Sequence, residues 1–237
     1  MAVACHAVIP AAGSGTRMQS DIPKQYLPLA GRCLLEHSLT VLLDNPDIAS
    51  IAVALGTDDS RAASLSLLRD PRVRTTIGGD ERADSVLAGL ACLGAYAADD
   101  DWVLVHDAAR PCLPAGDLRR LISTVRGSDI GGILAEPVVD TVKQASADGL
   151  VEATLDRDRL WRAQTPQMFR LGELRQALRR SLALGVAVTD EASAMEHAGF
   201  PVQLVRGSAA NLKVTVAEDL ALAAWYLQQR KDDGGSR

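Results

Sequence analysis

A loop of small residues follows the first apolar run of the chain and has the composition of a phosphate-binding turn. Residues 10–18 are PAAGSGTRM. Small side chains let a backbone turn come close to a ligand, and consecutive free N–H groups can then form an anion-binding nest. Two common nucleotide motifs are absent, because Met18 stands where a dinucleotide fingerprint needs its third glycine and no Gly-Lys-Ser/Thr sequence is present. The loop predicts a phosphate cradle of another kind, and an ordinary strand-to-helix turn is the alternative.

Two cations accompany this loop. Arg17 and Lys24 are seven residues apart around a turn that contains Pro23. The guanidinium of an arginine offers a planar fork to phosphate oxygens, and the ammonium of a lysine offers a point charge. The two side chains could therefore act on one polyphosphate, whereas the alternative is a pair of solvated surface cations.

The elements that must position these residues alternate along the chain. Apolar, β-branched runs are typical of strands buried on both faces, and apolar residues at steps of three and four are typical of helices. We expect strands over 3–9, 48–55, 73–77, 102–106, 133–139 and 202–205, and helices over 34–43, 59–68, 82–93, 118–126 and about 190–198. This order predicts an α/β fold, a Rossmann-like and mostly parallel sheet with helices on both faces. Ligands of such sheets bind beyond the carboxyl ends of the strands.

One segment interrupts this alternation. Residues 137–160 contain two short β-like runs around Asp148-Gly149, which predicts a β-hairpin arm that projects from the sheet. Farther on, Thr215 and Glu218 could form a capping box at the start of a terminal helix. We expect residues 1–230 to form a single domain and residues 231–237 a disordered tail.

Several motifs beyond the first loop resemble those of a known enzyme family. They are PKQY at 23–26, GGDERADSV at 78–86, VHDAARP at 105–111, DTVK at 140–143, DR at 156–157, TPQ at 165–167, TDEAS at 189–193 and NLKVT at 211–215. Together with AAGSGTRM they resemble the sugar-phosphate nucleotidyltransferases over nearly the whole chain, and most closely the 2-C-methyl-D-erythritol 4-phosphate cytidylyltransferases. The resemblance implies cytidylyl transfer from CTP to 2-C-methyl-D-erythritol 4-phosphate, with release of pyrophosphate, in non-mevalonate isoprenoid biosynthesis.

The implied reaction joins two anions, since a phosphate oxygen of the acceptor attacks the α-phosphorus of CTP in line. Catalysis then depends on positioning and charge neutralisation. By resemblance, Arg17 and Lys24 stabilise the transition state, and Arg157 and Lys213 hold the acceptor phosphate. A solvated helix face is the alternative for Arg157, because residues 156–180 carry seven arginines against three acidic residues.

The resemblance also implies a magnesium ion. Asp107 follows a predicted strand, and Mg²⁺ prefers one or two carboxylates together with phosphate oxygens and water. By resemblance this carboxylate binds the metal, and a helix cap is the alternative for an aspartate at that place. Arg110 either contacts the substrate or braces the same loop.

The remaining implied contacts fall into two groups. The contacts to CTP are Ala11, Ala12, Gly13, Gly15, Gly79, Asp80, Ser85 and Ala108. The contacts to the acceptor are Asp107, Arg110, Thr141, Thr165 and Thr189. The resemblance further implies a homodimer in which the arm clasps the second subunit and carries Arg157 into its active site.

Composition limits the other partners. The chain has 25 Lys and Arg against 30 Asp and Glu, a net charge of −5, so we expect neither nucleic acid nor a membrane as a partner. Its four cysteines and four histidines are dispersed, which favours buried thiols over a zinc site or a Ser/His/Asp triad. No basic region precedes the N-terminal apolar run, and no uninterrupted apolar stretch approaches about 18 residues. We expect a cytoplasmic enzyme.

Three alternatives stay open. A ribitol-5-phosphate cytidylyltransferase shares the same motifs, although Thr141, Arg157 and the TPQ motif favour methylerythritol phosphate. A non-catalytic nucleotide-sensing module is disfavoured because the chain keeps Lys24 and Lys213 together with the other charged residues of the site. A dinucleotide-dependent reductase is disfavoured by Met18.

Overall fold

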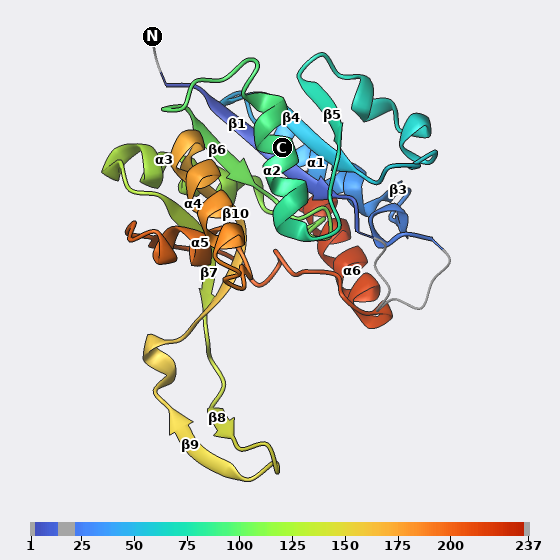
Figure 1. The fold of residues 1–237 in the computed structure, drawn as a ribbon. Coiled ribbons are helices and arrows are strands. Elements are labelled where there is room, and N and C mark those ends of the chain that lie inside the picture. The colour runs from blue at the N-terminus through green and yellow to red at the C-terminus, as the bar shows by residue number, and fades with distance from the viewer. Residues whose placement is uncertain (1–2, 14–21, 235–237) are drawn as a thin grey trace.

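Seven strands form the central sheet of the protein (Figure 1). The computed structural model describes residues 3–13 and 22–234, with the side chains described up to Arg230. The strand order is β11-β7-β10-β6-β1-β4-β5. The bounds are β1 (Cys5–Ala11), β4 (Ile48–Leu55), β5 (Val73–Ile77), β6 (Trp102–Val105), β7 (Gly132–Pro137), β10 (Trp161–Arg170) and β11 (Gln203–Arg206). Every neighbouring pair is parallel except the two pairs that β10 makes, which confirms the mostly parallel sheet.

Helices cover both faces of this sheet. One apolar cluster joins it to α1 (Leu34–Leu43) and α3 (Ala115–Ser128), and the other joins it to α2 (Arg82–Leu93), α4 (Leu171–Ala183) and α5 (Glu191–His197). In β1, Ala7 and Ile9 belong to the first cluster while Val8 belongs to the second, because successive side chains of a strand point to opposite faces. The predicted α/β architecture is therefore confirmed.

The segment between β4 and β5 differs from its prediction. Instead of one helix over 59–68, the chain forms two 3-10 helices, η3 (Ala62–Ser64) and η4 (Ser66–Arg69). Leu65 between them has extended backbone angles, and this break lets Leu65, Leu67 and Leu68 all pack against the core. In one continuous helix, Leu65, Leu67 and Leu68 would point to different sides of the helix, so they could not all face the core.

The terminal helix α6 (Ala217–Gly234) begins at a different cap from the one that we expected. The carboxylate of Asp219, not of Glu218, accepts hydrogen bonds from the Thr215 N–H, the Thr215 hydroxyl and the Val216 N–H. The helix continues four residues beyond residue 230, the expected end of the domain. Its buried Ala223 packs in a third apolar cluster with Leu34 and Val214.

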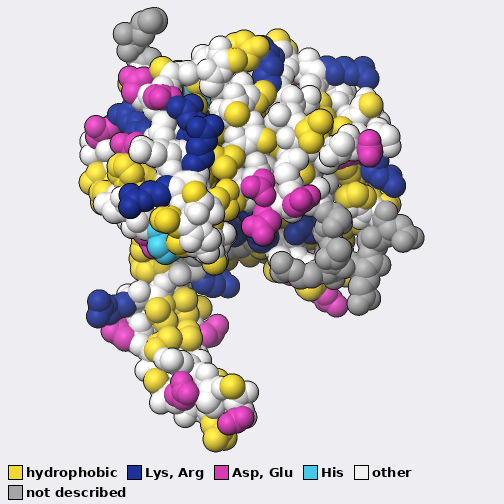
Figure 2. Space-filling view, viewed as in Figure 1, with side chains coloured by type: hydrophobic (Ala, Val, Ile, Leu, Met, Phe, Trp, Pro, Cys, Tyr) yellow, Lys and Arg dark blue, Asp and Glu magenta, His cyan; other side chains and the backbone are white. Residues whose placement is uncertain are grey.

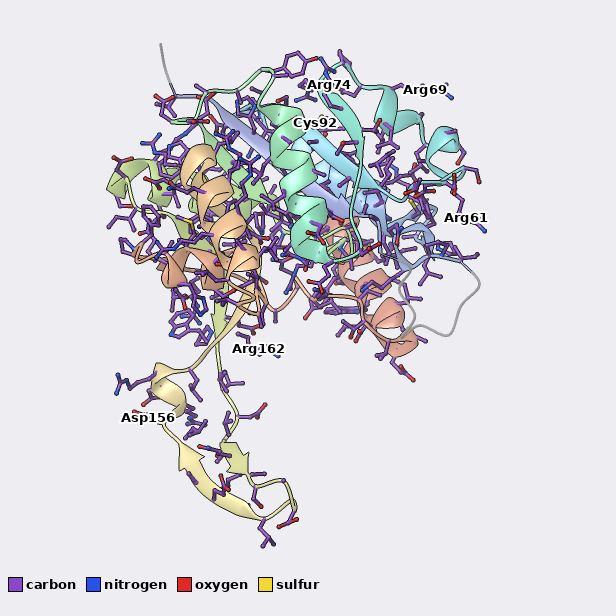
Figure 3. The ribbon with its side chains drawn as sticks, in the orientation of Figure 1. Arg61, Arg69, Arg74, Cys92, Asp156 and Arg162 are labelled. Atoms are coloured by element: carbon purple, nitrogen blue, oxygen red, sulfur yellow. The ribbon has the colours of Figure 1, made fainter. Side chains whose placement is uncertain are left out.

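Two small two-stranded sheets complete the fold. The strands β2 (Pro28–Leu29) and β3 (Arg32–Cys33) lie between η2 (Lys24–Tyr26) and α1. The strands β8 (Val142–Ala145) and β9 (Val151–Leu155) form the predicted hairpin, followed by η5 (Arg157–Arg159). The hairpin projects from the body as a separate arm, which Figure 2 shows with hydrophobic side chains on its surface. Figure 3 places Asp156 on the arm and Arg162 at its root, where Arg162 forms an ion pair of 2.6 Å with Glu136.

A glycine in α2 sets the distance between this helix and the sheet. A Cβ atom on Gly89 would lie 2.5 Å from Cγ1 of Val8, which is fully buried. We expect Gly89→Ala to lower the free energy of unfolding by about 1–3 kcal/mol, because the core at this point has no space for a methyl group. Urea denaturation measures the change.

Gly127→Ala is the matched control, because a Cβ atom on Gly127 in α3 would meet nothing within 4 Å. Here the free energy of unfolding should rise by up to about 1 kcal/mol, because alanine has a higher helix propensity than glycine. Equal effects of the two substitutions would contradict close packing at Gly89.

Candidate active site

Two adjoining cavities lie beyond the carboxyl ends of β1, β5 and β6. The first, of about 280 Å³, is lined by residues 10–13, Lys24, Gln25, residues 79–82, Ser85, residues 107–109 and Lys213. The second, of about 250 Å³, is lined by Arg82, Asp107, Arg110, residues 163–165, Gln167, Thr189, Asp190 and Lys213. Arg82, Asp107 and Lys213 line both cavities and form the wall between them. The sheet edge that the sequence predicted as the ligand site thus carries a divided cleft.

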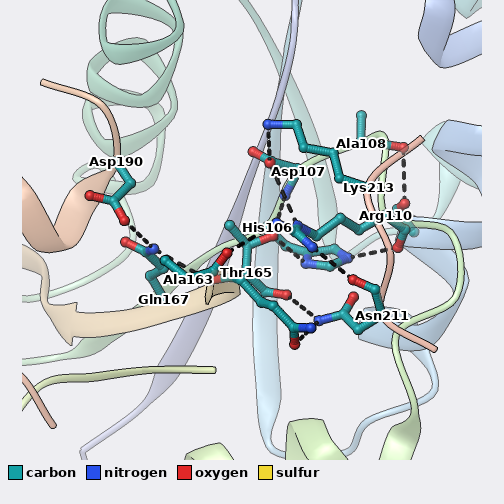
Figure 4. Close-up of polar contacts among 12 residues, drawn as sticks. His106, Asp107, Ala108, Arg110, Ala163, Thr165, Gln167, Asp190, Asn211 and Lys213 are labelled. Carbon is teal, nitrogen blue, oxygen red and sulfur yellow. Dashed lines mark hydrogen bonds and ion pairs between the residues drawn. The ribbon is translucent and has the colours of Figure 1, made fainter. Parts of the chain in front are cut away.

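Asp107 is the electrostatic centre of this wall. Its buried carboxylate accepts a hydrogen bond of 2.9 Å from Nε of Arg82 and lies 2.8 Å from Nζ of Lys213. Nε of Arg110 lies 3.8 Å from the same carboxylate. Burial alone would raise the pKa of Asp107, but these cations outweigh it and hold the pKa well below its usual range. Asp107 is therefore an anion in the folded protein, and Figure 4 shows it beside Lys213.

A buried histidine fixes the backbone beside Asp107. The Asp107 N–H donates to Oγ1 of Thr165 at 3.0 Å, and this oxygen lies 3.1 Å from Nδ1 of His106. Nε2 of His106 lies 3.2 Å from the Arg110 carbonyl, which can only accept, so Nε2 carries the proton and the Thr165 hydroxyl donates to Nδ1. Burial lowers the pKa of His106 to about 4, so the ring is neutral at pH 7. The hydroxyl of Thr165, a predicted contact of the acceptor, thus bonds to His106 and to the Asp107 N–H, and Thr165 also lines the second cavity (Figure 4).

Arg110 braces three segments of the cleft. It donates from Nη1 to the Asn211 carbonyl at 2.7 Å and from Nη2 to the Ala163 carbonyl at 3.4 Å. Nδ2 of Asn211 donates in turn to the Thr165 carbonyl at 2.8 Å. These hydrogen bonds fix the segment that carries Lys213, so the structure shows a bracing role for Arg110, and its contact with the substrate stays a prediction (Figure 4).

Arg82 and Glu191 form an ion pair that the sequence analysis missed. Arg82 is the first residue of α2, and its Nη1 and Nη2 donate to the two carboxylate oxygens of Glu191 at 2.6 and 3.0 Å. Glu191 is the first residue of α5 and is fully buried. Arg82 lies in the GGDERADSV motif and Glu191 in the TDEAS motif, but their separation of 109 residues gave no local signal of the pairing.

The turn before α2 packs directly against the first loop. A Cβ atom on Gly78 would lie 2.6 Å from Cβ of Ala12 and from Oγ of Ser85, so only glycine fits there. Oγ of Ser85 accepts a hydrogen bond of 3.2 Å from the Gly79 N–H. Ser85 is buried, and its hydroxyl therefore fixes the backbone groups of Gly79 at the wall of the first cavity.

The structure brings together most of the residues that we had predicted for the site. Those that line the cavities are Ala11, Ala12, Gly13, Lys24, Gly79, Asp80, Ser85, Asp107, Ala108, Arg110, Thr165, Thr189 and Lys213. Thr141 and Arg157 line neither cavity, because both belong to the arm, where Nη1 of Arg157 donates to the Val139 carbonyl at 2.6 Å. Gly15 and Arg17 lie outside the described residues.

The fold and the cleft together define the class of protein. A mostly parallel α/β sheet whose strands end at a cleft lined by glycines and by Lys24, Arg82 and Lys213 is typical of nucleotide-binding proteins. Residues 5–229 match the model of the family described as 2-C-methyl-D-erythritol 4-phosphate cytidylyltransferase (IspD), and the chain belongs to this family.

Relatives and solved structures agree with this assignment. The chain is 55% identical over 227 residues to the 2-C-methyl-D-erythritol 4-phosphate cytidylyltransferase of Ectopseudomonas mendocina, an alignment that covers 94% of this chain and 97% of the relative. A crystal structure of 4-diphosphocytidyl-2C-methyl-D-erythritol synthase superposes with a TM-score of 0.82 at 38% identity, covering 96% of this chain and all of that one. The Francisella tularensis cytidylyltransferase gives a TM-score of 0.80, also at 38% identity, over 94% of this chain and 99% of that one. No helix within residues 3–13 and 22–234 has the length and apolarity to cross a membrane.

Proposed function

We propose that the protein transfers a cytidylyl group from CTP to 2-C-methyl-D-erythritol 4-phosphate and releases pyrophosphate. The observation that carries this proposal is the divided cleft, in which two cavities meet at one charged wall of Arg82, Asp107 and Lys213. A reaction between two phosphate-bearing substrates needs two compartments and shared cations between them. The names of the closely similar relatives support the choice of both substrates.

In this mechanism CTP occupies the first cavity. The backbone of residues 79–80, fixed by Ser85, offers hydrogen-bonding groups to the base, and the loop from residue 10 approaches the nucleotide closely. Lys24 lines the same cavity and neutralises charge on the polyphosphate. Arg17 is proposed to act beside Lys24.

The acceptor phosphate enters the second cavity, next to Lys213 and Thr189. One of its oxygens forms a bond to the α-phosphorus of CTP while the bond from that phosphorus to the leaving pyrophosphate breaks. No proton has to move in this step. The contribution of the protein is therefore alignment of the two phosphates and neutralisation of the charge that accumulates between them.

Mg²⁺ is the proposed cofactor, and the donor set fits it. Within the described chain no group of three or more His, Cys, Asp or Glu residues could hold a metal ion, so an all-protein cage is not formed there. Asp107 presents one anionic carboxylate at the wall of both cavities, and Mg²⁺ commonly takes one or two carboxylates with the remaining ligands from phosphate and water. When bound, the metal supplies further charge neutralisation at the phosphates.

Replacement of Asp107 tests its place at the metal. We expect Asp107→Asn to raise the Mg²⁺ concentration at half-maximal rate at least about tenfold, because the amide keeps the size of the side chain and removes the charge. Magnesium titration of the steady-state rate measures this. Asp99→Asn is the matched control, since Asp99 pairs with Arg175 on the surface and its side chain is 70% exposed. An unchanged Mg²⁺ requirement in Asp107→Asn would contradict the assignment.

We further propose a homodimer that exchanges its arms. Val139, Leu150 and Val151 on the arm are 71%, 71% and 64% exposed, and a lone two-stranded hairpin is marginally stable in water. A second subunit would cover these side chains. It would also bring Arg157 and Thr141 toward an active site, which they do not reach in their own subunit. The cytoplasmic location stays a prediction from the sequence.

Pyrophosphate release tests the function directly. The protein is incubated with Mg²⁺ and CTP, with and without 2-C-methyl-D-erythritol 4-phosphate or ribitol 5-phosphate. Release that depends on the methylerythritol compound is expected. Release that depends on ribitol phosphate alone would assign the alternative acceptor, and CTP binding without release from either would favour a nucleotide-sensing module.

A further inference from the structure

Arg82 has hydrogen-bonding capacity that the protein leaves unused at the wall between the two cavities. A guanidinium carries five N–H donors, and three of them are used here, one by Asp107 and two by Glu191. One N–H on each terminal nitrogen has no acceptor among the described residues. The side chain is 29% exposed and lines both cavities, so the side chain of Arg82 is accessible from the cleft.

Glu191 fixes the plane of this guanidinium. Its carboxylate is fully buried, and Arg82 is its side-chain partner among the described residues. A buried carboxylate carries a large desolvation cost that only a well-formed pair offsets. The two-point contact to Glu191 and the third contact to Asp107 leave the group little freedom to rotate.

The same pair also joins α2 to α5, and a purely structural role is the competing explanation. Apolar side chains of similar volume would join two helices without burying charge. They would not place spare N–H donors where the two cavities meet. Glu191 is buried and Arg82 is partly exposed, which matches a site in which three N–H groups of the guanidinium are held by carboxylates and the other two remain for an anion.

We propose that Arg82 is a further catalytic residue of the cytidylyl transfer, whose two spare N–H groups bind phosphate oxygens where CTP and the acceptor meet, and that Glu191 is its positioning residue. This inference rests on the proposed function. Arg82 exchanges no proton: it donates hydrogen bonds to oxygens whose negative charge increases as one P–O bond forms and the bond to pyrophosphate breaks.

The test uses Arg82→Gln, Arg82→Lys and Glu191→Gln in the full-length protein. Arg82→Gln is expected to lower kcat/KM by about 10²-fold, the scale of one lost transition-state donor. Arg82→Lys should recover only part of the loss, because an ammonium cannot contact Glu191 at two points while donating to Asp107 and a phosphate. Glu191→Gln should lower kcat by about tenfold with KM for CTP nearly unchanged, since it loosens Arg82 without removing it.

Arg175→Gln is the matched control. Arg175 also forms an ion pair between two elements, at 2.7 Å from Asp99, but it lines neither cavity. Its loss should change thermal stability and leave kcat as in the wild type. If Arg82→Gln, or Arg82→Lys should the first variant fail to fold, keeps the wild-type kcat/KM, the proposal is overturned.

A second readout separates this inference from the proposed function. The affinities of CTP and of cytidine are measured by calorimetry for wild type and Arg82→Gln. Should the wild type release no pyrophosphate with either acceptor, the proposed function fails. A selective loss of CTP affinity in the variant, with cytidine affinity unchanged, would still support a phosphate contact at Arg82. Equal CTP affinities of the two proteins in that case would overturn the contact as well.

Discussion

Lys24→Ala is expected to lower kcat by about 10²- to 10³-fold while the protein stays folded. Lys24 lies at the start of η2 and lines the first cavity, where the polyphosphate of CTP is proposed to bind. Its ammonium offsets charge that is greatest in the transition state, so its loss should act mainly on kcat. Binding of CTP in the ground state keeps its other contacts and should weaken less.

We expect Lys24→Ala to leave the fold of η2 unchanged, because Gln25 and Tyr26 bind this segment to the rest of the protein. Nε2 of Gln25 donates to the Ala11 carbonyl at 2.8 Å, and the hydroxyl of Tyr26 donates to Asp59 at 2.6 Å. Both residues are buried. Removal of the Lys24 side chain therefore leaves η2 anchored to β1 and to the loop after β4.

Three measurements check this prediction: kcat, the dissociation constant for CTP, and the free energy of unfolding in urea. Arg179→Ala serves as the control, because Arg179 is an exposed cation of α4 that lines neither cavity of the cleft. Its rate should match that of the wild type. A Lys24→Ala protein with near-normal turnover would remove Lys24 from the catalytic machinery.

Segments whose buried side chains are apolar could be predicted from the sequence. The bounds of α1, α2, β4 and β5 follow their hydrophobic patterns to the residue. Their burial depends on local periodicity, which a sequence displays directly. The position of the cleft followed as well, because parallel strands bring the segments after their carboxyl ends to one edge of the sheet.

The central strand β10 could not be predicted in the same way. Gln164, Thr165 and Gln167 are buried in it, and Pro166 argues against a central strand because it donates no hydrogen bond to a neighbour. The pairing of β10 with β7 is irregular between Ala163 and Gln167, at the place of this proline. The buried polar groups are satisfied by distant partners, as when the Gln167 amide contacts Asp190 and the Ala192 N–H. Such partners leave no periodic signal in the sequence.

The same reason explains why part of the site was missed. The ion pair between Arg82 and Glu191 joins the starts of two helices that are far apart in the sequence. The Thr165 hydroxyl stays a predicted contact of the acceptor, and a sequence cannot show that it also bonds to His106 and to the Asp107 N–H. The sequence therefore predicted which residues line the cleft. It could not show which other residue of the protein each of them contacts.

The arm gives the second large prediction. An equal mixture of inactive Lys24→Ala and Arg157→Ala protomers should recover about one quarter of the wild-type activity once subunits exchange. Random exchange makes half of the dimers mixed. In each mixed dimer one site carries both lesions, while the other combines an intact Lys24 with an intact Arg157 from the neighbour. Arg157 lies on the arm, away from both cavities of its own subunit, and only a shared site permits this recovery.

A double variant, Lys24→Ala with Arg157→Ala in one chain, supplies the opposite control. An equal mixture of this double variant with wild type should have about one quarter of the activity of the same total amount of wild type, because a mixed dimer then has no intact site. If each chain contained its whole site, the mixture would keep about one half of that activity. Tagged protomers and native mass spectrometry establish that exchange has occurred. Proven exchange with no recovery in the first mixture and no inhibition in the second would show that each chain builds its site alone, and Arg157 would then be a solvated residue of the arm.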